Sequence, residues 1–160
     1  MMENLALESK FTDGPDGRVH YQELGEGPAV ILIHGGGPGA YGYSNYRRNI
    51  VPLSQRNRVI VMDLPGYGQS AKRSRPDGLT VSLANAVRDI MDYEGIEKAS
   101  LVGNSLGGMT SLRFALDTPE RVNKLILMGP GGSLPMFTAF PTEGLQRMLN
   151  FYEGEGPTLE

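Results

Sequence analysis

Leu101–Thr110 reads LVGNSLGGMT, and these ten residues decide between two kinds of site. Gly103–Thr110 nearly matches the phosphate-binding loop G-x-x-x-x-G-K-[ST]. Gly103–Gly107 matches the nucleophile elbow G-x-S-x-G. A phosphate-binding loop needs a lysine before its final Ser or Thr, because the ammonium group neutralises phosphate charge. Met109 occupies that position, so at most a weak anion site would remain. The stretch therefore favours the elbow.

An elbow needs a strand, a sharp turn that holds a serine, and then a helix. The apolar run ASLVGN (99–104) predicts a buried strand, and residues 105–116 carry apolar side chains at helical spacing. Glycines beside the serine suit such a turn, because it leaves little room for β-carbons. An ordinary helix with Ser105 as its N-cap would explain the same residues. The ten residues alone leave both interpretations open.

The rest of the chain alternates strand and helix patterns. Continuous apolar runs predict buried strands, residues with a 3.6 period predict helices, and two short segments around a turn-rich stretch predict a hairpin. This alternation predicts an α/β fold with a mostly parallel sheet and helices on both faces. The predicted strands are 29–34, 58–63, 99–104 and 122–129, the helices 44–55 (capped by Ser44), 80–93 and 105–116, and the hairpin arms 5–11 and 18–24; a further helix is expected to start near 142.

Composition describes an ordinary globular protein. The chain has 160 residues, 39% hydrophobic and 21% charged, which is enough for one domain with a core. Net charge is −3 and no basic cluster stands out, so we expect no nucleic-acid partner. The absence of cysteine excludes disulfides and thiolate metal sites. No segment resembles a signal peptide or a membrane span, which makes a cytoplasmic location the default expectation.

A second glycine-rich loop, HGGGPGAYG (34–42), follows the strand at 29–34. Gly37, Gly39 and Gly42 match the dinucleotide fingerprint G-x-G-x-x-G, with Asp63 as its acidic partner. His34 and two glycines separate the strand from that match, and Pro38 and the glycines make a poor helix start. In a hydrolase the same loop would direct a backbone N–H at the oxyanion, with a second N–H after the nucleophile. The two glycine-rich loops therefore fit one catalytic arrangement.

Four motifs together resemble the meta-cleavage product hydrolases of the α/β-hydrolase superfamily: HGGGPGAYGYSNYRRNI (34–50), DLPGYGQS (63–70), LVGNSLGG (101–108) and LILMGPGG (125–132). The resemblance implies the N-terminal portion of an α/β-hydrolase fold. Residues 1–134 would form a partial core, residues 135–160 would begin the helical lid, and the remainder of the core would be absent. It also implies cleavage of a carbon–carbon bond in 2-hydroxy-6-oxohexa-2,4-dienoates from aromatic degradation. The partner is then a small-molecule substrate, and no cofactor or metal is implied.

By the same resemblance, Ser105 would be the nucleophile, and the backbone amides of Gly36 and Leu106 would form the oxyanion hole. Asn45 and Asn104, with Gly35, would bind the polar dienol and carboxylate end of the substrate. Asn45 could equally be a helix-cap or turn residue, and Asn104 a residue that tolerates unusual backbone angles. Tyr43 departs from the family, where Trp is frequent, and we expect a change in packing more than in chemistry.

The remaining titratable residues of the motifs have structural interpretations. We expect Asp63 to end a strand, His34 to brace the glycine loop, and His20 to lie on a strand far from the elbow. In this fold the triad order is Ser, then Asp or Glu, then His, yet no histidine follows Ser105. We therefore expect a truncated chain that is nearly inactive alone. We also expect it to be marginally stable or to self-associate, as a homo-oligomer, through an exposed sheet edge near the strand at 122–129.

Three rival interpretations remain. An esterase or a proline iminopeptidase-like enzyme also uses a glycine-rich loop, although the latter carries Trp beside its serine where this chain has Asn104. A non-catalytic remnant would fit the missing downstream histidine. A nucleotide-binding protein would be stabilised against heat by ATP or NAD.

Overall fold

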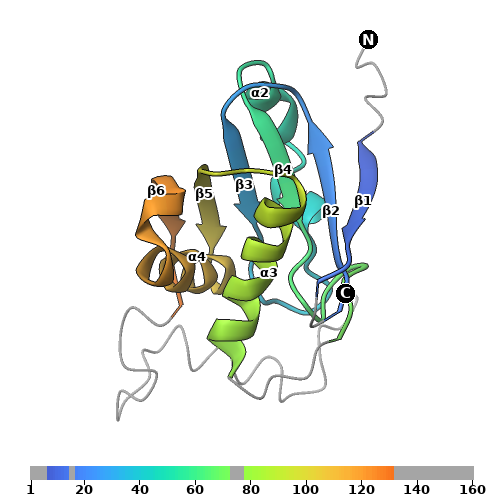
Figure 1. Ribbon diagram of the computed structural model, residues 1–160. Coiled ribbons are helices and arrows are strands. Elements are labelled where there is room, and N and C mark those ends of the chain that lie inside the picture. Colours follow the sequence, from blue (N-terminus) through green and yellow to red (C-terminus); the bar gives the residue numbers. More distant parts are fainter. Residues whose placement is uncertain (1–6, 15–16, 73–77, 132–160) are drawn as a thin grey trace, which may run out of the picture.

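The computed structural model describes residues 7–14, 17–72 and 78–131, and these build a six-stranded mixed sheet (Figure 1). The strand order is β1-β2-β4-β3-β5-β6. The first two strands run antiparallel to their neighbours and the other four are mutually parallel. The strands are β1 (Glu8–Thr12), β2 (Val19–Leu24), β3 (Ala29–Ile33), β4 (Arg58–Met62), β5 (Ala99–Asn104) and β6 (Val122–Met128). The predicted hairpin and the predicted mostly parallel sheet are both confirmed.

Helices cover both faces of this sheet, as the alternating pattern predicts. The long helices α3 and α4 lie on one face, in front of the sheet in Figure 1, and the two short helices α1 and α2 pack on the other. The helices are α1 (Gly42–Tyr46), α2 (Ile50–Ser54), α3 (Leu79–Tyr93) and α4 (Leu106–Asp117), with a 3₁₀ turn, η1, at Pro119–Arg121.

Alternate side chains of the central strands point to opposite faces, and each face has its own core. On β3, Ile31 and Ile33 pack in the core beneath α3 and α4, whereas Val30 and Leu32 pack in the core beneath α1 and α2. All four side chains are buried. A run that is apolar at every position is therefore what a strand buried on both faces requires.

The single helix predicted over 44–55, with Ser44 as its cap, is wrong. The chain forms α1 and α2 separately, and Ser44 lies inside α1, where its hydroxyl accepts from the Tyr41 N–H (3.2 Å) and donates to the Tyr41 carbonyl (2.8 Å). Pro52 explains the break. Proline has no N–H to donate to the carbonyl four residues earlier, and its ring clashes there, so a helix can begin just before it but cannot run through it.

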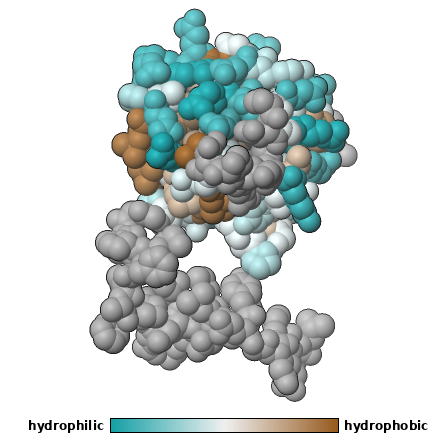
Figure 2. Space-filling model, turned by 60° about the horizontal axis from the view of Figure 1, so that its bottom comes forward, coloured by the Kyte–Doolittle hydropathy of each residue, from teal (hydrophilic) through white to brown (hydrophobic). Residues whose placement is uncertain are grey.

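The fourth predicted strand lies at the edge of the described sheet, as expected, but the expectation that it is buried is wrong. β6 is an edge strand whose side chains are half-buried or exposed, with Ile126 52% and Met128 42% exposed. Figure 2 shows hydrophobic surface on this side of the molecule, at the left of the view. The lid and the last helix, predicted from residue 135 onward, lie outside the described residues and stay predictions.

Candidate active site

Ser105 is held in a strained turn between β5 and α4. Its backbone angles are φ 50° and ψ −109°, and among the described residues it is the one non-glycine residue with positive φ. An ordinary N-cap serine has extended backbone angles, and its hydroxyl binds an amide of the first helical turn. Ser105 does neither, and its side chain is exposed at the carboxyl end of the parallel strands. This geometry favours the elbow over the simple helix cap.

Two glycines near Ser105 allow neighbouring backbone segments to approach closely. A β-carbon placed on Gly107 would lie 2.1 Å from the Ile33 carbonyl oxygen, and one on Gly103 would lie 2.4 Å from the Gly107 carbonyl oxygen. Because real β-carbons do not approach that closely, both positions require glycine. Helix α4 can therefore start directly against β3, and the turn stays sharp.

The loop after β3 lies against this turn. A β-carbon on Gly35 would lie 3.5 Å from Ser105 Cβ, and one on Gly36 would lie 2.9 Å from Leu106 Cδ2. Within the described part of the chain, no acceptor binds the backbone N–H of Gly36 or of Leu106. These two N–H groups belong to the residues that the sequence interpretation names as oxyanion donors. Gly35 differs, because its N–H donates to Asn45 Oδ1 at 3.2 Å.

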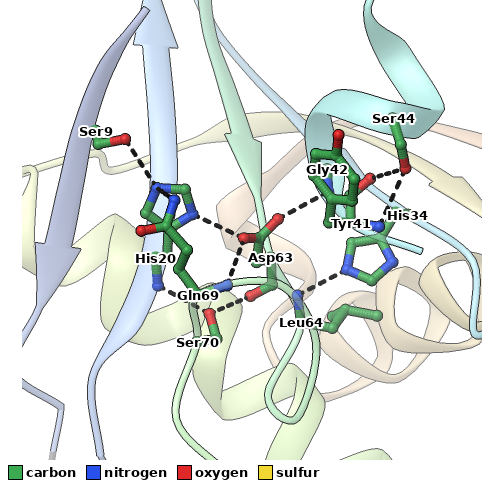
Figure 3. Close-up of polar contacts among 10 residues, drawn as sticks. All are labelled: Ser9, His20, His34, Tyr41, Gly42, Ser44, Asp63, Leu64, Gln69 and Ser70. Atoms are coloured by element: carbon green, nitrogen blue, oxygen red, sulfur yellow. Dashed lines mark hydrogen bonds and ion pairs between the residues drawn. The ribbon is translucent and has the colours of Figure 1, made fainter. Parts of the chain in front are cut away.

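His34 joins the glycine loop to the neighbouring strand. Its Nε2 accepts from the Leu64 N–H at 2.9 Å (Figure 3). The ring proton therefore sits on Nδ1, which donates to the Gly35 carbonyl at 2.6 Å. Burial lowers the pKa of His34, although the bond to Gly35 and the charge of Asp63 partly oppose that shift. Both ring nitrogens are engaged, so His34 braces the loop as predicted and has no free nitrogen for proton transfer.

Asn45 and Asn104 come together beside the elbow. Asn104 Nδ2 donates to Asn45 Oδ1 at 3.1 Å, the same oxygen that accepts from the Gly35 N–H. Within the described residues, the Asn45 Nδ2 group has no acceptor of its own. A hollow of about 270 Å³ adjoins the pair on the face of α1 and α2. Its lining mixes amides with apolar groups: Leu32, Asn45, Tyr46, Asn49, Leu53, Val102, Asn104 and Met128.

Asp63 is the centre of a second buried polar cluster, one that the sequence interpretation did not predict. Its carboxylate accepts from the His20 ring (2.8 Å), the Gly42 N–H (2.8 Å) and the Gln69 N–H (3.0 Å) (Figure 3). Burial alone would raise the pKa of Asp63, but these hydrogen bonds together lower it below its usual value. Asp63 does end β4 as expected, and it also ties β2, the start of α1 and the following loop together.

His20 lies on β2, and β4 and β3 separate it from β5 and the elbow. Its Nδ1 is held by Asp63, and its Nε2 faces Ser9 Oγ (3.1 Å) and Gln69. Its predicted remoteness from Ser105 is confirmed. The pairing of His20 with Asp63 had no local signal, because it depends on β2 lying next to β4. These are the two histidines of the chain.

The described residues hold no cluster of three or more His, Asp or Glu side chains that could bind a metal ion. Among the same residues, no helix is long and apolar enough to cross a membrane.

Known proteins similar to this chain are hydrolases. Residues 28–157 match the family model for the α/β hydrolase fold. A 2-hydroxy-6-oxononadienedioate/2-hydroxy-6-oxononatrienedioate hydrolase from Comamonas testosteroni is 50% identical over 137 residues, which is 84% of this chain and 48% of that protein. A 2-hydroxy-6-oxo-6-phenylhexa-2,4-dienoate hydrolase from Burkholderia cepacia is 47% identical over 145 residues, covering 89% of this chain and 50% of that protein.

Solved structures agree with the fold. A 2-hydroxy-6-oxo-6-phenylhexa-2,4-dienoate hydrolase from Rhodococcus sp. strain RHA1 superposes with a TM-score of 0.77 at 35% identity, over 92% of this chain and 54% of that one. A serine hydrolase from Cycloclasticus zankles superposes with a TM-score of 0.81 at 30% identity, over 94% of this chain and 54% of that one. The chain spans about half the length of the curated relatives it matches. The resemblance to meta-cleavage product hydrolases is thus confirmed as homology over that half.

Proposed function

The chain belongs to the α/β-hydrolase family, and on that premise we propose that it carries the nucleophile and the oxyanion hole of a carbon–carbon bond hydrolase. The substrates are 2-hydroxy-6-oxohexa-2,4-dienoates, the class to which the substrates of the homologous enzymes belong. One observation carries the proposal. Ser105 sits in a strained elbow, Leu106 follows it directly and the Gly36 loop lies against Leu106; the N–H groups of Gly36 and Leu106 have no acceptor in the described part of the chain.

The geometry suits attack on a carbonyl carbon. After the dienol has become its keto tautomer, Ser105 Oγ adds to the C6 carbonyl and its proton passes to a general base. The N–H groups of Gly36 and Leu106 stabilise the negative charge that develops on the carbonyl oxygen. The C5–C6 bond then breaks, the departing carbon fragment takes a proton and leaves as 2-hydroxypentadienoate, and water releases the other fragment as a carboxylic acid.

Asn45 and Asn104 hold the polar end of the substrate. The Asn45 oxygen already accepts from Gly35 and from Asn104, so its Nδ2 donors face outward, where they suit a carboxylate or an enolate oxygen. Gly35 contributes by fixing Asn45 and not by donating to the substrate, because its own N–H is occupied.

The general base comes from outside the residues described above. His34 uses both ring nitrogens within the loop, and His20 is paired with Asp63 on a distant strand. A serine hydroxyl at its ordinary pKa is a weak nucleophile without such a base. A polypeptide of residues 1–160 is therefore the natural negative control for the activity test.

The test uses the protein at its natural length, assayed for loss of absorbance of a yellow 2-hydroxy-6-oxohexa-2,4-dienoate and, in parallel, for release of p-nitrophenol from an ester. We expect turnover of the dienoate that Ser105→Ala abolishes, and far slower turnover by residues 1–160. Ester hydrolysis without dienoate cleavage would identify the protein as an esterase. Turnover of neither compound would favour a non-catalytic remnant.

The proposed partner is the small-molecule substrate. We also propose that residues 1–160 associate with copies of themselves along β6, because this strand exposes apolar side chains and has a partner strand on one side only among the described residues.

A further inference from the structure

We propose that Tyr67 is a positioning residue for the oxyanion hole, acting through a hydrogen bond to the loop that carries the Gly36 donor. This inference rests on the proposed function and adds a residue to it. Tyr67 Oη donates to the Gly36 carbonyl oxygen at 3.0 Å. Tyr67 lies in the loop after β4, far in sequence from both Gly36 and Ser105.

Tyr67 is itself held in place. Its backbone N–H donates to the Leu64 carbonyl (2.9 Å), and its carbonyl accepts from the Ser70 N–H (3.0 Å). Its ring packs edge-on against His34, with ring centroids 5.1 Å apart, and it is half-buried. The hydroxyl therefore projects from a restrained turn, and the ring contact restrains it further.

Three successive peptide groups of the glycine loop each have a different partner. The Gly35 N–H donates to Asn45, the Gly35 carbonyl accepts from His34, and the Gly36 carbonyl accepts from Tyr67. In a trans peptide the N–H points away from the preceding carbonyl, so the His34 bond turns the Gly36 N–H outward. Among the described residues, Tyr67 is the one hydrogen-bond partner of the peptide plane between Gly36 and Gly37.

The neighbouring residues make that second restraint necessary. Gly36 has no side chain to limit its two dihedral angles, and a β-carbon on Gly37 would meet no heavy atom within 4 Å. The next three residues, Gly37, Pro38 and Gly39, are exposed. Without the Tyr67 hydroxyl, the chain beyond Gly36 would lose the contact that fixes its direction, and the N–H would sample other orientations.

Tyr67 also confines Gly36 in space. A β-carbon on Gly36 would lie 3.2 Å from Tyr67 Oη on one side and 2.9 Å from Leu106 Cδ2 on the other. The glycine is thus held between the tyrosine hydroxyl and the residue that carries the second donor. The hydrogen bond and this close fit together restrain the loop that carries the Gly36 N–H against the residue that carries the Leu106 N–H, and pre-organised stabilisation of an oxyanion requires donors that are fixed in this way.

The experiment compares Tyr67→Phe with Tyr93→Phe in the protein at its natural length. Tyr93 is a matched control because it is 63% exposed at the far end of α3. Two quantities are measured: the kinetic constants on the dienoate, and the ¹⁵N relaxation order parameter of Gly36 in protein labelled with ¹⁵N-glycine. Circular dichroism and melting temperature confirm that both variants fold.

We expect Tyr67→Phe to lower kcat about tenfold, because the variant loses one hydrogen bond. KM should stay within about twofold of the wild-type value. The order parameter of Gly36 should fall from about 0.85 to below about 0.6. Tyr93→Phe should change neither quantity.

A kcat for Tyr67→Phe equal to that of Tyr93→Phe, or an unchanged order parameter, overturns the proposal. A looser Gly36 with unchanged kcat also overturns it, because the bond would then be structural only. If the proposed function itself is wrong, the result is different: the wild-type protein does not turn over the dienoate, and the Ser105→Ala variant is equally inactive.

Discussion

Gly36 and Leu106 touch across the candidate active site: a β-carbon on Gly36 would lie 2.9 Å from Leu106 Cδ2 and 3.2 Å from Leu106 Cβ. One residue follows β3 and the other begins α4. Their backbone N–H groups are the two proposed oxyanion donors. The contact brings the loop after β3 against the start of α4, and it leaves little space for a β-carbon at position 36.

Gly36→Ala should lower kcat of the protein at its natural length by about a hundredfold, the effect of losing one oxyanion donor. The added methyl group displaces the loop or the Leu106 side chain, and the two N–H groups no longer converge. Stability should change little, because the closest atom is the end of a leucine side chain. Kinetics on the dienoate measure the effect, with Gly37→Ala as control. Equal kcat values for the two variants would contradict it.

Gly107→Ala should destabilise the fold by at least about 3 kcal/mol, because the new methyl group would lie 2.1 Å from the Ile33 carbonyl oxygen. Backbone cannot move aside as a side chain can. Gly37→Ala is again the control, since a β-carbon there meets no heavy atom within 4 Å. Urea denaturation gives both free energies of unfolding. A Gly107→Ala variant as stable as Gly37→Ala would show that α4 does not need its close approach to β3.

Asp63→Ala should cost about 3 kcal/mol of stability, because it leaves the buried N–H of Gly42 and the His20 ring without their acceptor. A β-carbon placed on Gly68 would lie 2.0 Å from Asp63 Oδ2, so the loop packs closely around the carboxylate. Asp13→Ala, at an exposed position, should change stability by less than about 0.5 kcal/mol. The comparison is made by thermal and urea unfolding. A small loss for Asp63→Ala would mean that water replaces the carboxylate.

Acid should destabilise the protein in two steps. Burial lowers the pKa of His34, so the unfolded chain takes up this proton first, and stability falls as pH drops below about 6.5. The hydrogen bonds to Asp63 outweigh the effect of burial and lower its pKa. The stability that the Asp63 carboxylate contributes is therefore fully present above pH 3.8 and is lost as the pH falls through the lower pKa of the folded state.

Free energies of unfolding measured by urea at a series of pH values test this dependence. His34→Gln should flatten the slope just below pH 6.5 and leave the more acidic step intact. A wild-type protein that becomes more stable between pH 7 and 5 would contradict the sign of the His34 shift.

A polypeptide of residues 1–160 should form concentration-dependent oligomers, because β6 leaves Ile126 and Met128 exposed on an unpaired edge. Ile126→Lys places a charge on that edge and should shift the species toward monomer in sedimentation velocity. Val51→Lys, on an exposed side chain of α2, is the control and should leave the oligomers unchanged. A monomer at all concentrations would show that the edge is covered.

The local features of the fold could be predicted because each depends on a short stretch of chain. The apolar run at 29–34 gave β3, and the spacing of side chains along 80–93 gave α3. Two predictions failed where the local structure depends on neighbouring residues or strands. Pro52 divides the helix predicted over 44–55, and the apolar β6 is exposed because it has one neighbouring strand.

By itself the sequence determined the alternation of strands and helices through the hydrophobic period, and it offered the elbow as one of two interpretations of residues 101–110. The backbone angles of Ser105 and the approach of Gly107 to Ile33 of β3 decided for the elbow. The tertiary structure decided which distant groups meet. The order β2-β4-β3-β5 brings His20 to Asp63, and the Tyr67 loop and α4 to Gly36. The physical reason is that a buried or strained polar group is satisfied by whichever strand lies beside it, and strand order is not written in local sequence.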